Sequence, residues 1–200
     1  MYHIFLQPFS AVEAMKKGST RAFAVMLFLA SGLGALALTL ILESSQMTNS
    51  AMNAMPVLAE LNALQLFLVM LVGIYVGNII RAFLIHLVMK IFTDKGAYVD
   101  AFKVVSATAY VGSVYILLVI ILGAVPVAGL GLAVFGLLLT IVTTLAILLR
   151  GIATMYKADI LTTWLAIGLI VFASMMALHM GVWGAKGEMH MYSQEIMDQF

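Results

Sequence analysis

The chain has 200 residues, of which 64% are hydrophobic and only 10% are Asp, Glu, Lys or Arg. Soluble domains carry roughly 25% charged residues because their surfaces face water, so this composition excludes a soluble fold and indicates a protein surrounded by lipid. The net charge is +1 and the basic residues form no patch interleaved with aromatics, which argues against a nucleic-acid partner. There is no cysteine, so disulfides, thiolate metal sites and a cysteine nucleophile are excluded.

The first 20 residues precede any membrane segment and predict a surface helix. Ser10 and Glu13 have the spacing of a capping box. Apolar side chains then recur at helical spacing, at Phe5, Phe9, Val12 and Met15. Since Lys16 and Lys17 follow, we expect residues 1–20 to form a cytoplasmic amphipathic helix on the inner leaflet. A plain juxtamembrane lead-in is the alternative.

Five apolar segments follow, each close to the roughly 20 residues of helix that cross a hydrocarbon core. They cover about residues 22–42, 61–89, 104–124, 131–149 and 160–182. The predicted fold is therefore all-α, a polytopic transmembrane bundle of five spans in a single domain, 21–183, with a short outer tail, 184–200. The turn at Pro126 and Gly129 is so short that the third and fourth spans must form an antiparallel hairpin.

The second and fourth segments leave questions about where each helix ends. Leu61 to Met89 is long for one crossing, so it is either a single tilted span or a span followed by a protruding or interfacial turn from Ala82 to Phe92. Arg81 is then expected at the inner boundary as a snorkelling anchor, and His86 among the lipid head groups. After the fourth span, Arg150 to Asp159 is predicted to be a short polar loop, with Asp159 as N-cap of the fifth span.

The basic residues predict the orientation of the bundle. With five spans, nine of the ten Lys and Arg residues fall on one side, and Lys186 alone falls on the other. The nine are Lys16, Lys17, Arg21, Arg81, Lys90, Lys95, Lys103, Arg150 and Lys157. The positive-inside rule then places the N-terminus in the cytoplasm and the C-terminus outside. Trp164 and Trp183, about 29 Å apart along a helix, are expected at the two interfaces of the fifth span.

Small residues on the second span form a helix-contact motif. Gly73 and Gly77 make a GxxxG pattern, and Ala173, Ala177 and Gly181 form a similar row on the fifth span. Small side chains let helix backbones approach closely in lipid, where no hydrophobic force drives helices together. The motif predicts either dimerisation or packing inside the bundle, and we favour packing inside the bundle.

Polar groups within the second span mark a candidate contact face. Tyr75, Asn78 and Arg81 are spaced by three and share one side of the helix, and ionisable groups inside a membrane are functional hypotheses by default. His179, near the outer end of the fifth span, is interpreted as an interface residue. No Asp or Glu lies deep in any span, so the carboxylate that a proton or cation relay requires is missing.

The outer tail contains soft metal ligands. Met189, His190 and Met191 combine thioether and imidazole groups, which suit Cu(I). They are candidate metal ligands in an alternative function, a small transporter or channel for a soft metal ion, but we favour a polar tail. The chain has no HExxH, Walker or GxSxG motif. We therefore predict a protein that is not an enzyme and has no cofactor.

Four short segments, in their positions relative to the spans, carry a resemblance to a known family. They are Leu6-Gln7-Pro8-Phe9, Gly96-Ala97-Tyr98 with Phe102, Val125-Pro126-Val127-Ala128-Gly129, and Leu149-Arg150-Gly151-Ile152. Over about residues 5–182 the chain resembles the Yip family, five-span membrane proteins named for interacting with Ypt/Rab GTPases, and in particular its prokaryotic branch.

The resemblance implies a non-catalytic protein of the prokaryotic cytoplasmic (inner) membrane. Such proteins are thought to organise membranes or to escort and assemble other membrane proteins. The expected partners are the lipid bilayer and other membrane proteins or a second copy of the chain. The expected role is an accessory or assembly subunit of a larger membrane complex, and the resemblance implies no cofactor and no catalytic residue.

Overall fold

The computed structural model describes residue 12 and residues 15–44, 61–124 and 129–176. Its long helices are α3 (Thr20–Ser44), α6 (Ala63–Phe92), α7 (Tyr98–Gly123) and α8 (Gly129–Tyr156), followed by a shorter apolar helix, Ile160–Met176. Within the described residues, the four long helices are long and apolar enough to cross a membrane and there is no strand. The prediction of an all-α, multi-pass membrane bundle is confirmed.

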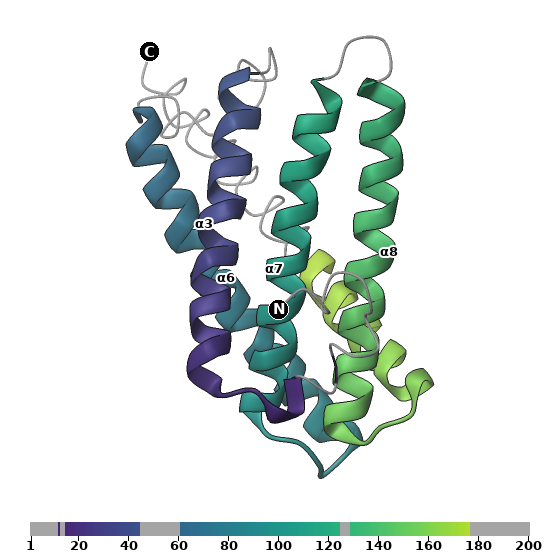
Figure 1. The fold of residues 1–200 in the computed structure, drawn as a ribbon. Coiled ribbons are helices and arrows are strands. Elements are labelled where there is room, and N and C mark those ends of the chain that lie inside the picture. Colours follow the sequence, from purple (N-terminus) through teal and green to yellow (C-terminus); the bar gives the residue numbers. More distant parts are fainter. Residues whose placement is uncertain (1–11, 13–14, 45–60, 125–128, 177–200) are drawn as a thin grey trace, which may run out of the picture.

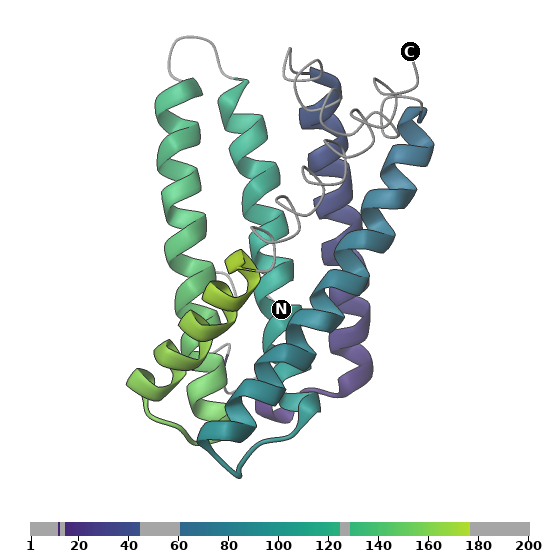
Figure 2. The same cartoon turned by 180° about the vertical axis from the view of Figure 1, so that it is seen from behind.

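The helix α6 is continuous to Phe92, so of the two alternatives for this segment the structure has the single tilted helix and not a span followed by an interfacial turn. Its first turn is fixed by a capping box, in which the Gln65 amide donates to Asn62 Oδ1 at 2.9 Å and the Asn62 amide donates to Gln65 Oε1 at 3.0 Å. No Gly or Pro follows Arg81 to end the helix before Phe92. At 30 residues, about 45 Å of helix exceeds a hydrocarbon core of roughly 30 Å. The helix is accordingly tilted against α3 and α7 (Figures 1 and 2).

The predicted polar loop from Arg150 is also wrong, because α8 continues to Tyr156. Ile152 and Tyr156 are fully buried, so packing of this last stretch outweighs the polar residues that suggested a loop. The connection to the next helix shrinks to a few residues around Lys157, whose φ is 52°. Likewise α7 begins at Tyr98, earlier than predicted.

The hydrophobic core lies at one end of the bundle, where α3 and α7 begin and α6 and α8 end (Figure 1). We call this the basic end, because the described Lys and Arg residues other than Arg81 belong to the helix ends that meet there or to the segments beside them: Lys16, Lys17, Arg21, Lys90, Lys95, Lys103, Arg150 and Lys157. Met15 of the N-terminal segment is fully buried in this core while Lys16 and Lys17 are exposed.

The helix α7 lies between α3 and α8 and packs tightly against both (Figures 1 and 2). A Cβ added to Gly151 of α8 would lie 2.7 Å from Val104 Cγ1 of α7, so the absence of a side chain permits the close approach. On the other side, the Ser113 hydroxyl of α7 donates to the Ala30 carbonyl of α3 at 2.8 Å. These contacts hold the three helices in one layer.

Several predicted features lie outside the described residues. They include Phe5, Phe9, Ser10 and Glu13 of the lead-in, Pro126 of the turn, Ala177, His179, Gly181 and Trp183 of the fifth span, Lys186, and the tail motif of Met189, His190 and Met191. The cytoplasmic placement of the basic end and the division into lead-in helix, bundle and tail remain predictions.

Candidate functional site

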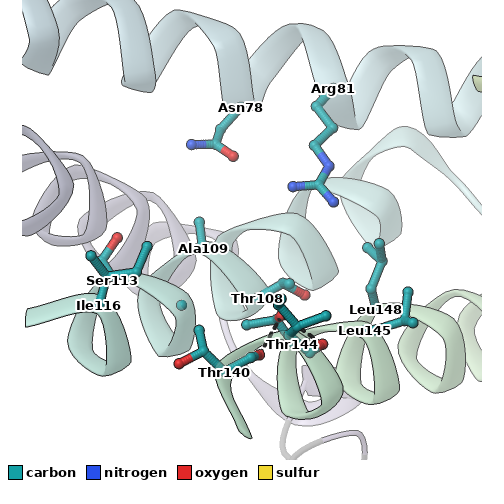
Figure 3. Close-up of a pocket in the computed structure, with 12 residues that line it drawn as sticks. Asn78, Arg81, Thr108, Ala109, Ser113, Ile116, Thr140, Thr144, Leu145 and Leu148 are labelled. Atoms are coloured by element: carbon teal, nitrogen blue, oxygen red, sulfur yellow. Dashed lines mark hydrogen bonds between the residues drawn. The ribbon is translucent and has the colours of Figure 1, made fainter. Parts of the chain in front are cut away.

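A polar cleft of about 380 Å³ lies between α6, α7 and α8 (Figure 3). Its polar lining residues are Asn78, Arg81, Thr108, Ser113, Thr140 and Thr144. The remaining lining is apolar and includes Ile141, Leu145 and Leu148 of α8. The cleft therefore offers hydrogen-bonding groups on an apolar background within the membrane-spanning part of the bundle.

The α6 wall of the cleft supplies its charge. Arg81 and Asn78 extend from α6 toward α7 and α8 (Figure 3). The Asn78 Nδ2 donates to the Ile74 carbonyl at 2.9 Å, which leaves its second amide hydrogen and its oxygen available. Arg81 makes no hydrogen bond or ion pair within the described part of the chain. A charged side chain within the hydrocarbon core is costly unless it finds a partner, so this guanidinium calls for water or an anion.

Hydroxyl groups on the opposite walls already use their protons. Thr108 donates to the Val104 carbonyl at 2.8 Å, and Thr140 donates to the Gly136 carbonyl at 2.7 Å. These hydroxyl oxygens therefore remain as acceptors. The lining includes no carboxylate and no histidine. The cleft presents one positive charge with N–H donors from α6, an arrangement suited to holding an anion and lacking the paired nucleophile and base of a hydrolytic site.

Of the face predicted from the sequence, the structure brings Asn78 and Arg81 together in the cleft but separates Tyr75 from them. The Tyr75 ring packs edge-on against Phe28 of α3, with ring centroids 6.4 Å apart. The reason is the tilt of α6. Its first half lies beside α3, and its second half runs toward the end of α8 (Figure 2). Tyr75 is thus a contact with α3.

The glycine motif on α6 does not pack inside the bundle as we favoured. A Cβ added to Gly73 or Gly77 would meet no described atom within 4 Å, and both residues are exposed. From Leu66 to Ala82 no intervening residue of α6 is buried. The small-residue face is therefore open in the described structure.

At the basic end, a hydrogen-bonded cluster centres on a tyrosine that the sequence analysis missed. The Tyr156 hydroxyl donates to the Ala97 carbonyl at 3.2 Å and lies 2.8 Å from His86 Nδ1. Because a hydroxyl has one proton, Nδ1 of His86 must be the donor in that contact. His86 thus has a protein partner, and its position among the lipid head groups remains a prediction.

The loop between α6 and α7 closes over the Tyr156 ring. Gly96 has φ of +81°, and a Cβ at this position would lie 2.5 Å from the Tyr156 ring. Thr93 Oγ1 also donates to the Tyr156 carbonyl at 3.4 Å. The available sequence signal was the spacing of Ile152 and Tyr156, two largely apolar side chains one helical turn apart, within a segment that we interpreted as a loop.

The short Ile160–Met176 helix begins at Asp159, as predicted. Asp159 Oδ1 accepts from the Thr162 amide and Oδ2 accepts from the Thr162 hydroxyl, both at 2.7 Å. These hydrogen bonds favour the carboxylate, so they lower the pKa of Asp159 from its ordinary value. Within the described residues, no group of three or more His, Asp or Glu side chains could hold a metal ion, and the predicted tail ligands fall outside them.

These observations define a class: an all-helical, multi-pass integral membrane protein with a polar cleft between its helices. A family model of the Yip1 domain matches residues 2–182, and the chain belongs to the Yip family. The resemblance noted in the spans and turns is thereby confirmed. Comparisons with curated proteins and with solved structures give no match.

Proposed function

We propose that this Yip-family protein is a non-catalytic membrane adaptor that holds another membrane protein through helix–helix contacts along α6. The observation that carries the proposal is the exposure of α6. Only 6% of its most apolar stretch is buried in the bundle, compared with 39% for α3 and for α7. A helix so sparsely covered by its own chain offers its surface to a partner.

Small residues distinguish this surface from one that only faces lipid. Gly73 and Gly77 are exposed one turn apart, and together they form a shallow strip on which a second helix can approach closely. A glycine strip gives lipid chains no advantage comparable to the close approach of a second helix. Glycine also disfavours a helix by about 0.5–1 kcal/mol relative to alanine. The exposed pair therefore supports a protein partner, in agreement with an accessory or assembly role.

The test is affinity purification of the tagged protein in mild detergent, with mass spectrometry of the retained proteins. The expected result is a stoichiometric membrane-protein partner that is lost when Gly73 and Gly77 are both replaced by Leu. The matched control is Gly168→Leu, since Gly168 is likewise exposed with no described atom within 4 Å of an added Cβ. A partnerless wild-type particle, or equal loss in the control, contradicts the adaptor function.

The second candidate, a small transporter or channel, draws on the cleft between α6, α7 and α8. Asn78 and Arg81 provide a polar lining for a solute. The positive charge of Arg81 opposes passage of a cation in a low-dielectric setting, so the cleft does not favour a soft metal ion. Cu(I) flux into proteoliposomes that is abolished by Asn78→Ala or Arg81→Ala would support the transporter, and the adaptor function predicts no such flux.

A further inference from the structure

The depth of Arg81 places its charge within one leaflet. Arg81 lies about 16 Å along the helix axis from Phe92, the last residue of α6 at the basic end. Arg81 lies about 27 Å from Ala63, the first residue of α6, and a helix that begins near the opposite surface has passed the middle of a core of roughly 30 Å well before that distance. The guanidinium therefore lies on the basic side of the midplane, within reach of lipid head groups that enter from that leaflet.

The cleft is built to hold an anion that also carries an apolar part. Arg81 has five N–H donors and no partner among the described residues, and Asn78 adds one amide hydrogen. Beside these donors, Leu145 and Leu148 of α8 provide an apolar wall. The volume of about 380 Å³ falls within the range of about 300–1,000 Å³ that is usual for ligand sites.

We propose that this cleft binds a phospholipid from the leaflet at the basic end, with its phosphate on Arg81 and Asn78 and part of an acyl chain along Leu145 and Leu148. Guanidinium groups bind phosphate through paired N–H donors. A free phosphate ion shares this chemistry but gains nothing from the apolar wall. The basic residues around the same end attract anionic lipids, so phosphatidylglycerol is expected to bind more tightly than zwitterionic phosphatidylcholine.

The test is native mass spectrometry of the purified full chain, titrated separately with phosphatidylglycerol and phosphatidylcholine. Wild-type protein is expected to retain phosphatidylglycerol preferentially. Arg81→Gln is expected to weaken this binding about tenfold or more, because a hydrogen bond to a charged group is lost. The matched control is Arg21→Gln, which removes an exposed positive charge at the same end of the bundle but outside the cleft and is expected to weaken the binding much less than Arg81→Gln.

A further variant and a comparison with inorganic phosphate separate the lipid proposal from its alternatives. Arg81→Lys keeps the charge and loses the forked donors, so it is expected to bind more weakly than wild type, and it serves if Arg81→Gln does not fold. Equal binding by wild type and both Arg81 variants overturns the proposal. If inorganic phosphate stabilises the delipidated protein against heat as much as phosphatidylglycerol does, the site is one for free anions and the lipid assignment is wrong. The lipid assignment is also wrong if the purified protein carries a bound protein that is lost in the Arg81 variants and shows no preference between the two lipids.

The lipid proposal does not rest on the adaptor function. The Arg81 variants leave Gly73 and Gly77 in place, and the glycine variants leave Arg81 in place. Failure of one proposal is therefore distinguishable from failure of the other.

Discussion

His86 and Tyr156, which are 70 positions apart in the sequence, are joined by a contact of 2.8 Å between Nδ1 and the phenolic hydroxyl. The same hydroxyl donates to the Ala97 carbonyl. One side chain of α8 thereby ties together the end of α6 and the start of α7. Tyr156 is fully buried, whereas His86 is half-buried and Ala97 is exposed, so the hydroxyl bridges the core and the surface of the basic end.

Tyr156→Phe is expected to destabilise the protein by about 0.5–1.5 kcal/mol, since it removes the hydrogen bonds of the hydroxyl while His86 is only half-buried and Ala97 is exposed. The measurement is thermal or denaturant-induced unfolding in detergent. The matched control is Tyr115→Phe, because Tyr115 packs against the same core while its hydroxyl bonds to no described residue. A double-mutant cycle with His86→Leu should give a coupling energy of at least about 0.5 kcal/mol; zero coupling would show that the contact contributes nothing.

Gly96→Ala is expected to destabilise the protein by at least about 2 kcal/mol. The left-handed backbone at φ +81° costs an L-residue about 1–2 kcal/mol, and the added Cβ would overlap the Tyr156 ring, which adds an overpacking cost. Unfolding in detergent measures the loss. In Gly168→Ala the new methyl meets no described atom within 4 Å, so stability should be unchanged or slightly higher. Equal effects of the two substitutions would refute the closed loop.

Gly151→Ala tests the close packing of α7 on α8. The new Cβ would lie 2.7 Å from a methyl of Val104, and a β-branched side chain in a helix has little rotamer freedom to move aside. The expected loss is about 1–3 kcal/mol. Combining it with Val104→Ala, which removes the clashing methyl, should restore part of that loss. If the double variant loses the full sum of the single effects, the two residues do not meet as described.

Asp159 gives the protein a pH dependence of predictable sign. Its folded pKa lies below the ordinary value of 3.8 because the Thr162 amide and hydroxyl donate to the carboxylate. The stabilisation that the ionised Asp159 cap contributes is therefore complete above pH 3.8, and it is lost as the pH falls through the lower pKa of the folded state.

The comparison for this prediction is Asp159→Asn, which keeps a capping side chain but does not titrate. The stability of wild type relative to this variant should be constant from pH 7 to 5 and should fall below pH 3.8. The relative stability is measured by unfolding in a detergent whose charge does not change with pH. A relative stability that stays flat to pH 2.5 would show that the cap does not favour the carboxylate.

The sequence alone predicted the membrane class, the helical fold and the family. The membrane class and the helical fold follow from composition and from the lengths of apolar segments, because lipid requires each crossing to satisfy its own backbone hydrogen bonds, whereas the family rested on the resemblance of four short segments. The Asp159 cap was also predictable, since an N-cap depends on residues within one turn. Asn78 and Arg81 were identified as facing one side because helical spacing fixes which residues share a face.

The sequence could not show where helices end or which helix each side chain meets. Arg150 suggested a loop, but burial of Tyr156 in the core extends α8 past it. Gly73 and Gly77 suggested a packed interface, but the tilt of α6 leaves them open. The His86–Tyr156 contact and the cleft at Arg81 join segments of the chain that are distant in sequence. Periodicity describes one helix at a time, whereas the tilts and separations of packed helices, which bring such residues together, are decided only in three dimensions.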